Sequence, residues 1–170
     1  SGKNGTKPAM LPLIRRFVAG ETAEEALRAV DGLNGRGLKA TLDLLGEEAR
    51  SKEQAAEAAR EIAALFDRIA EARADCNVSV KLTQLGLSLS EDAARDNLLR
   101  VLETAERRGN FARIDMEGSA YTQRTLDIFG EVFRQSKRVG PVIQASLRRS
   151  RADIEALIRA HQDSLYAFIL

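Results

Sequence analysis

The sequence predicts an α/β fold: part of a (βα)8 barrel, preceded by a short N-terminal helix. Three observations predict it. Apolar strand-like segments alternate with helical patterns roughly every 30 to 40 residues. Each strand-like segment has one apolar and one polar side. An eight-unit barrel takes about 250 residues, whereas this chain has 170 residues. We therefore expect four βα units plus a fifth strand.

The chain divides into three predicted parts. Residues 1–12 are rich in Gly, Lys and Pro and are expected to form a flexible lead. Residues 13–36 form an N-terminal helical segment, in which Thr22 is placed to cap a helix and Glu25 follows three residues later. Residues 37–170 form the first half of the barrel. A chain that stops after a fifth strand leaves an open sheet edge, so we interpret it as a truncated barrel or a gene remnant.

Helical patterns separate the predicted strands. Residues 51–73 carry an apolar stripe at helical spacing and are rich in strong helix formers. A second helix is expected to begin after Ser90 and to stop at Gly109. Residues 122–139 and 151–160 are predicted to form the last two helices.

The strand-like segments decide between two parallel-sheet architectures. They are residues 38–45, 78–85, 111–116, 142–147 and 166–170. An open sheet covered on both faces has nearly continuous apolar strands. Here apolar and polar residues alternate, which favours a barrel wall with an apolar side toward the helices and a polar side toward the lumen.

Charge and composition exclude several classes of function. The formal net charge is +1, so no broad field attracts nucleic acid or an anionic membrane surface. One cysteine and one histidine provide neither an internal disulfide nor a histidine-based metal site, so we expect no bound metal. No apolar run approaches the roughly 20 residues of a membrane span. These features predict a cytoplasmic protein.

The candidate chemistry lies on the polar side of the strands. Lys81, Asp43 and Asp115 fall on one face at a similar level and are expected to form an internal ion cluster. A structural ion pair is the alternative interpretation. Glu117 lies two residues after Asp115 and projects to the same side. Gln144 offers both a donor and an acceptor, which suits the edge of a heterocycle such as a flavin ring.

Five segments together resemble the bacterial proline dehydrogenase family, in matching order and spacing. They are FVAGET at 17–22, TLDLLGE at 41–47, SVKLTQLG at 79–86, RIDMEGS at 113–119 and VGPVIQA at 139–145. The resemblance implies a distorted (βα)8 barrel that holds FAD at the carboxyl ends of its strands. It further implies oxidation of L-proline to Δ1-pyrroline-5-carboxylate, with electrons passing to a membrane quinone, so the protein could sit peripherally at the inner membrane face.

The same resemblance assigns roles to individual residues. Lys81 is implied to stand beside the flavin and the substrate, Asp115 to pair with Lys81, and Gln144 to hydrogen-bond the flavin ring. Asp43 and Glu117 are expected near the substrate.

Some features depart from the family pattern. Ser146 stands where the family usually has tyrosine. The fifth strand lacks the family's arginine and lysine, and the last helix with its paired arginines is absent from the 170 residues. We therefore expect the isolated chain to be inactive. Two alternatives stay open: a non-catalytic half barrel that self-associates to cover its open edges, and a Schiff-base aldolase that uses Lys81.

Overall fold

The computed structural model describes residues 18–160, in which helices and parallel strands alternate. The predicted lead at 1–12 and the predicted fifth strand at 166–170 lie outside the described residues. The strands are β1 (Ala40–Asp43), β2 (Cys76–Val80), β3 (Ala112–Ile114) and β4 (Val139–Pro141).

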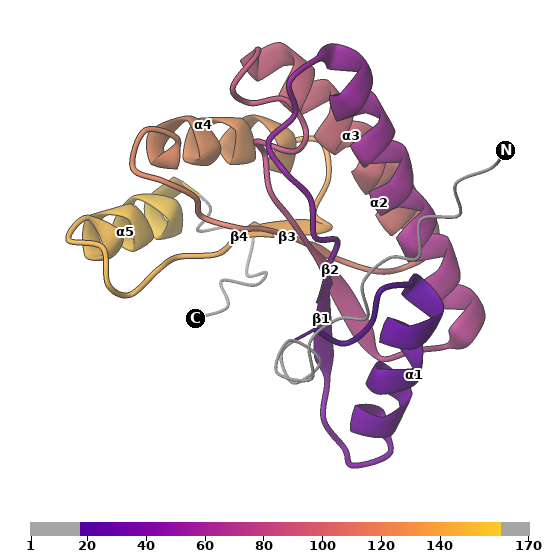
Figure 1. Cartoon of the computed structure of the whole chain (residues 1–170). Coiled ribbons are helices and arrows are strands. Elements are labelled where there is room, and N and C mark those ends of the chain that lie inside the picture. Colours follow the sequence, from indigo (N-terminus) through magenta and orange to yellow (C-terminus); the bar gives the residue numbers. More distant parts are fainter. Residues whose placement is uncertain (1–17, 161–170) are drawn as a thin grey trace, which may run out of the picture.

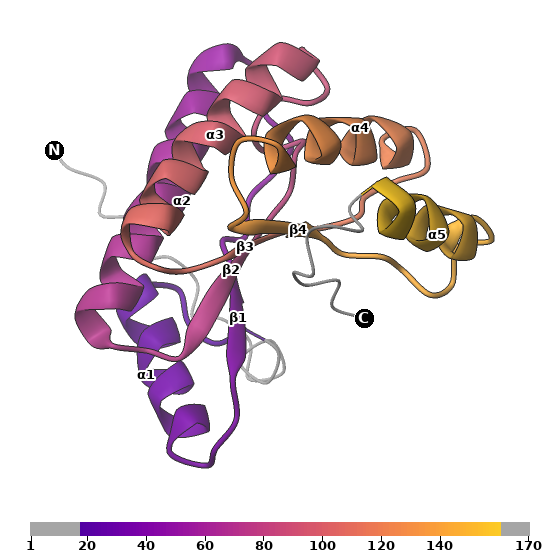
Figure 2. The same cartoon turned by 180° about the vertical axis from the view of Figure 1, so that it is seen from behind.

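The four strands form one parallel sheet in the order β1-β2-β3-β4. Each new strand is thus added on the same edge of the sheet, as in a barrel wall, whereas a doubly wound sheet reverses its strand order. Helices α2, α3 and α4 form an arc on one side of the twisted sheet (Figure 1), and the view from behind shows the same arrangement (Figure 2). The α/β class and the partial-barrel architecture are confirmed.

Side-chain caps define where the main helices begin. The helices are α1 (Ala23–Asn34), α2 (Lys52–Ala72), α3 (Glu91–Arg107), α4 (Thr122–Phe133) and α5 (Ser150–Ala160). Thr22, Ser51 and Ser90 each accept a hydrogen bond from the backbone N–H three residues later, as N-cap residues do. Sequence patterning therefore located the starts of α2 and α3 correctly.

The hydrophobic core lies between the sheet and the helix arc. Leu42, Val78, Val80 and Ile114 face the helices and are buried. Helix α2 contributes the stripe that its sequence pattern predicted: Ala55, Ala59, Ile62, Leu65, Phe66 and Ile69. The alternating polar residues point to the other side of the sheet, so the apolar side faces the helices as expected for a barrel.

The predicted fourth strand was misplaced. Residues 142–147 form no strand, and β4 is Val139–Pro141 instead. Helix α4 ends at Phe133 and so leaves room for β4. The Lys137 ammonium donates a hydrogen bond to the carbonyl of Phe133 (2.7 Å) at this helix end. Pro141 has no N–H to donate, and the chain leaves the sheet after Val142 donates to the carbonyl of Ile114 (2.8 Å).

The predicted second strand was too long at its carboxyl end. The observed strand, β2, begins at Cys76 and ends at Val80, and residues 82–89 form consecutive turns. Gly86 adopts φ +102°, which favours glycine, and a Cβ there would lie 3.1 Å from the Cβ of Ala55. The turns bury Leu82, Leu85 and Leu87 against the core. Their irregular spacing departs from the period of two that a strand requires.

Candidate functional site

The candidate site lies at the carboxyl ends of the first three strands. Asp43 is the last residue of β1, Lys81 follows β2 directly, and Asp115 follows β3 directly. Barrel enzymes place their catalytic groups at this end because the loops that follow the strands converge there. All three side chains project from the sheet face opposite the helices, since alternate residues of each strand are buried in the core.

These three residues form an ion cluster, which we call the lysine triad. The Lys81 ammonium donates a hydrogen bond to Oδ2 of Asp43 and lies 3.5 Å from Oδ2 of Asp115. The buried Ser79 hydroxyl donates to Oδ1, the other carboxylate oxygen of Asp115. Each side chain of the triad keeps about 30% of its surface exposed (30% for Lys81, 32% for Asp43 and 29% for Asp115). The structure therefore brings together the three residues that sequence alternation placed on one face.

The triad keeps Lys81 protonated. Partial burial lowers the pKa of Lys81, but the hydrogen bond and charge of Asp43 and the charge of Asp115 more than offset this and raise the pKa above its ordinary value. An amine nucleophile must instead lose its proton near neutral pH. This electrostatic environment disfavours the aldolase alternative.

The raised pKa predicts a pH-dependent contribution to stability. Because the folded pKa of Lys81 lies above the ordinary 10.5, the triad stabilises the fold fully below pH 10.5 and loses this contribution as pH rises through the folded pKa. We expect the difference in unfolding free energy between the wild type and Lys81→Met to stay constant from about pH 7 to pH 9 and to shrink above 10.5. Urea unfolding followed by circular dichroism measures it, and a constant difference up to pH 11.5 (about one unit higher) would contradict the triad's electrostatic role.

A second polar layer lies beneath the triad, toward the amino ends of the strands. The side-chain oxygen of Asn77 accepts hydrogen bonds from the Thr41 hydroxyl (2.8 Å) and from Nε of Arg113 (2.9 Å). Thus the polar side of β1, β2 and β3 is hydrogen-bonded across the strands rather than merely solvated. The sequence signal for this layer was the same alternation that located the triad.

Glu117 does not join the lysine triad. Its carboxylate accepts hydrogen bonds from the backbone N–H (3.0 Å) and the hydroxyl (2.5 Å) of Thr83. This bidentate contact ties the segment after β3 to the turns after β2. The structure therefore gives Glu117 a positioning contact in the neighbouring loops, and its place near a substrate stays a prediction.

Gln144 is exposed and lies in the segment that follows β4, not within a strand. Its Nε2 donates a hydrogen bond to the carbonyl of Met116 (3.0 Å), so the amide is held above the carboxyl end of β3. The Oε1 atom is the part of this amide left to accept a donor from another molecule. Gln144 therefore lies at the same end of the sheet as the triad, and its cofactor role stays a prediction.

Cys76 is buried at the start of β2. Burial and the nearby charge of Asp75 raise the pKa of its thiol to about 11. At about pH 8 we expect the native chain to react with a thiol-specific disulfide reagent at least about 100-fold more slowly than the urea-unfolded chain. The unfolded chain serves as the control, and equal rates would contradict the burial.

No group of three or more potential His, Cys, Asp or Glu ligands is placed to hold a metal ion within residues 18–160. Nor does any helix in this part of the chain have the length and apolar composition required to cross a bilayer.

Comparisons with known proteins agree on one family. The family model described as "Proline dehydrogenase" matches residues 26–169. The chain is 41% identical over 143 residues to "Proline dehydrogenase 1" of Bacillus subtilis subsp. natto, covering 84% of this chain and 47% of that protein. It is 34% identical over 154 residues to "Proline dehydrogenase 2" of Bacillus subtilis (strain 168), covering 91% and 49%.

Solved structures show the same relationship. The crystal structure of proline utilization A (PutA) from Bdellovibrio bacteriovorus, inactivated by N-propargylglycine, matches with a TM-score of 0.80 and 26% identity. That match covers 88% of this chain and 19% of the PutA chain. The chain spans about half the length of the curated relatives it matches. Family model, sequence identity and structural likeness together lead to one conclusion: the chain belongs to the proline dehydrogenase family.

Proposed function

We propose that this chain forms one wall of a site that oxidises L-proline to Δ1-pyrroline-5-carboxylate. The observation that carries the proposal is the lysine triad at the carboxyl ends of three adjacent parallel strands, in a chain of the proline dehydrogenase family. Family membership and the protonated state of Lys81 favour this function over the self-associating remnant and the aldolase.

The donor set on this face fits an FAD cofactor. A flavin ring edge presents nitrogen and oxygen acceptors together with one N–H donor. Lys81 would donate to the acceptors, and Oε1 of Gln144 would accept from the N–H. When bound, FAD supplies the hydride acceptor for proline oxidation. The described residues surround this position from one side only, because the sheet continues beyond neither β1 nor β4 within 18–160.

The chain's own residues would orient the reactants. Asp43 and Asp115 fix the Lys81 ammonium from two sides, and Ser79 fixes the orientation of the Asp115 carboxylate. Two carboxylates and one ammonium leave a surplus negative charge at the carboxyl end of the sheet. This charge favours a cationic or N–H-donating group of the substrate over an anionic one.

Because the triad is partly exposed and the chain spans half of its relatives, we propose that a second barrel half must cover the site. Excluding water strengthens the electrostatic interactions on which such a site depends. We further propose that electrons leave to a quinone at the membrane surface, which predicts proline-dependent reduction of a soluble quinone analogue by the completed barrel.

The test is the visible absorption spectrum of the purified chain, recorded beside its intact mass. We expect a colourless chain alone, and flavin absorbance near one FAD per complex once the carboxyl-terminal half of Bacillus subtilis proline dehydrogenase 1 is added. Near-stoichiometric flavin on the isolated chain would overturn the requirement for a second half. An assembled complex without flavin would overturn the proposed cofactor site.

A further inference from the structure

One cation on the polar face of the sheet lacks an acidic partner. Arg113 is half-buried on β3, between Ala112 and Ile114, whose side chains are fully buried in the core. Its side chain therefore projects to the same face as the lysine triad. The Nε atom donates a hydrogen bond to the side-chain oxygen of Asn77 (2.9 Å). This is the only hydrogen bond or ion pair of the guanidinium within residues 18–160, so both of its terminal NH2 groups are free there.

The carboxylates on the same face are held by other groups. Asp43 and Asp115 both pair with the ammonium of Lys81. Glu117 accepts two hydrogen bonds from one residue of the turns after β2. None of these carboxylates forms an ion pair with Arg113, so the charge of its guanidinium is not balanced within this wall of the barrel.

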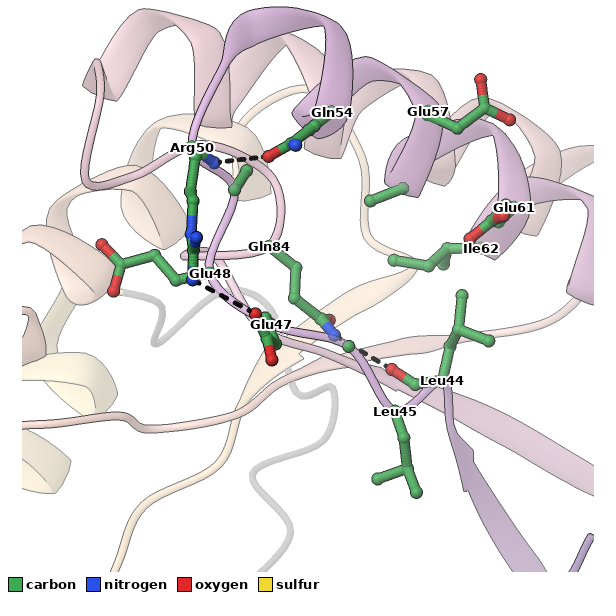
Figure 3. Close-up of a pocket in the computed structure, with 13 residues that line it drawn as sticks. Leu44, Leu45, Glu47, Glu48, Arg50, Gln54, Glu57, Glu61, Ile62 and Gln84 are labelled. Carbon is green, nitrogen blue, oxygen red and sulfur yellow. Dashed lines mark hydrogen bonds and ion pairs between the residues drawn. The ribbon is translucent and has the colours of Figure 1, made fainter. Parts of the chain in front are cut away.

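The acidic loop after β1 does not reach Arg113 either. Glu47 and Glu48 belong to this loop, which packs beside α2 (Figure 3). The backbone N–H of Arg50 donates a hydrogen bond to the side chain of Gln54 on α2 (2.8 Å) and holds the loop there. Any acidic partner of Arg113 therefore lies outside residues 18–160.

The hydrogen bonds across the strands show which layer of the barrel holds Arg113. In a (βα)8 barrel the lumen is filled by layers of four side chains, and alternate strands contribute the four members of a layer. Thr41 on β1 and Arg113 on β3 both donate to the same oxygen of Asn77 on β2, the strand between them. Thr41 and Arg113 therefore share one layer, and Asp43 and Asp115 share the next layer toward the carboxyl ends. The fifth and seventh strands would supply the other two members of the Arg113 layer.

The seventh strand is the member of this layer that can balance the charge. Thr41 is neutral, and residues 166–170, which the sequence predicts as the fifth strand, contain neither Asp nor Glu. In an eight-stranded barrel the seventh strand lies directly opposite the third. A side chain that points into the lumen from the seventh strand therefore faces Arg113.

Closing the barrel makes a counter-charge for Arg113 necessary. A charged group that is withdrawn from water destabilises the fold strongly unless it is paired and its donors are hydrogen-bonded. The two free NH2 groups of Arg113 form a planar fork, and this fork matches the two oxygens of a carboxylate. An Asp or Glu side chain satisfies both the charge and the donors at once.

A second copy of this chain does not provide that carboxylate. The four strands are parallel, so a second copy closes the barrel only around a two-fold axis that runs along the barrel. Its β3 would then occupy the seventh position, and its Arg113 would face the first Arg113 in the same layer. Two guanidinium groups would repel each other there.

From these features we infer that Arg113 is a docking residue for the second barrel half, and that the seventh strand presents an Asp or Glu side chain to its guanidinium across the lumen. The inference rests on the proposed function, because that function requires a second barrel half. It adds the charge pair by which the two halves recognise each other.

The test is the association of the full chain with the carboxyl-terminal half of Bacillus subtilis proline dehydrogenase 1, measured by titration calorimetry. Arg113→Gln is expected to weaken association by about 30-fold or more, because it leaves a carboxylate unpaired in the closed lumen. Arg113→Lys keeps the charge but loses the planar fork, so its loss should be smaller. The matched control is Arg60→Gln, since Arg60 is 66% exposed on α2 and pairs within its own helix. It should change affinity by no more than about twofold.

A double-mutant cycle identifies the carboxylate. Each Asp and Glu of the seventh strand in the added half is changed in turn to Asn or Gln. We expect one such change to weaken association about as much as Arg113→Gln does, and to cause little further loss when the two changes are combined. The cycle compares the partner's change in both backgrounds, so it remains informative if Arg113→Gln also lowers the stability of the chain. An affinity within about threefold of the wild type in Arg113→Gln, or additive losses at every Asp and Glu tested, overturns the inference.

Two further measurements separate the remaining outcomes. Sedimentation of the chain alone should show a monomer, and a dimer that fails to bind the added half would assign the lumen to a second copy and overturn the inference. Failure of the two halves to associate overturns it as well. Flavin content is recorded for every complex. A complex that shows the Arg113 coupling but holds no FAD supports this inference and overturns the proposed cofactor site alone.

Discussion

Lys81→Met is expected to lower kcat/KM for proline by about 100-fold or more in the completed barrel, the loss typical of removing one preorganised charged donor. Methionine matches the length of the lysine stem but removes the ammonium that joins Asp43 to Asp115. Those carboxylates then face each other without a counter-charge, and the cofactor and substrate lose a fixed donor. Steady-state kinetics with proline, alongside the flavin content of the variant, measures the effect.

The matched control is Lys39→Met. Lys39 is 82% exposed and pairs with Asp75 at 3.5 Å, at the opposite end of β1 from Asp43. We expect this variant to keep activity within about twofold, because exposed ion pairs contribute little. If Lys81→Met retained activity within a few fold of the wild type, the assignment of Lys81 to the site would be wrong.

Phe66→Ala is expected to destabilise the chain by about 3 to 5 kcal/mol, the cost of removing a large aromatic side chain from a packed core. Phe66 is fully buried on the inner face of α2 and, with Phe129, is one of the two largest fully buried side chains among the described residues. Truncation removes its apolar contacts and leaves a cavity between helices and sheet. The free energy of unfolding from urea denaturation, with the slope checked for two-state behaviour, gives the value.

Leu38→Ala provides the control for this substitution. Leu38 is 48% exposed, so its truncation is expected to change stability by no more than about 0.5 kcal/mol. A loss below about 1 kcal/mol in Phe66→Ala would contradict the packing of α2 against the sheet.

Helices were well predicted where capping and periodicity agreed. For α2, Ser51 marked the start and Ala55, Ala59 and Ile62 marked the buried stripe, and the structure has all four in those roles. Strand ends were predicted less well. Residues 142–147 alternate in polarity like a strand, but alternation in a half-exposed loop looks the same in sequence. What places β4 earlier is the helix end at Phe133.

The candidate site was predictable to the extent that it follows strand alternation. Lys81, Asp43 and Asp115 were placed on one face because parallel strands in register align their side chains. The pairing of Glu117 with Thr83 was not predicted, because the turns after β2 bend the chain back toward β3.

The contacts of Gln84 gave no local signal in the sequence. Gln84 meets Leu44 and Gly46 across 40 and 38 positions, and only the folded chain brings them together.

The central claim is that the polar face of this half barrel forms one wall of a flavin site for proline oxidation. The most direct measurement is the flavin absorbance of the completed barrel, followed anaerobically as L-proline is added. The account predicts that L-proline bleaches the flavin of the wild type and of Lys39→Met, and bleaches that of Lys81→Met far more slowly. A wild-type complex that holds flavin and shows no bleaching with saturating L-proline would contradict the account.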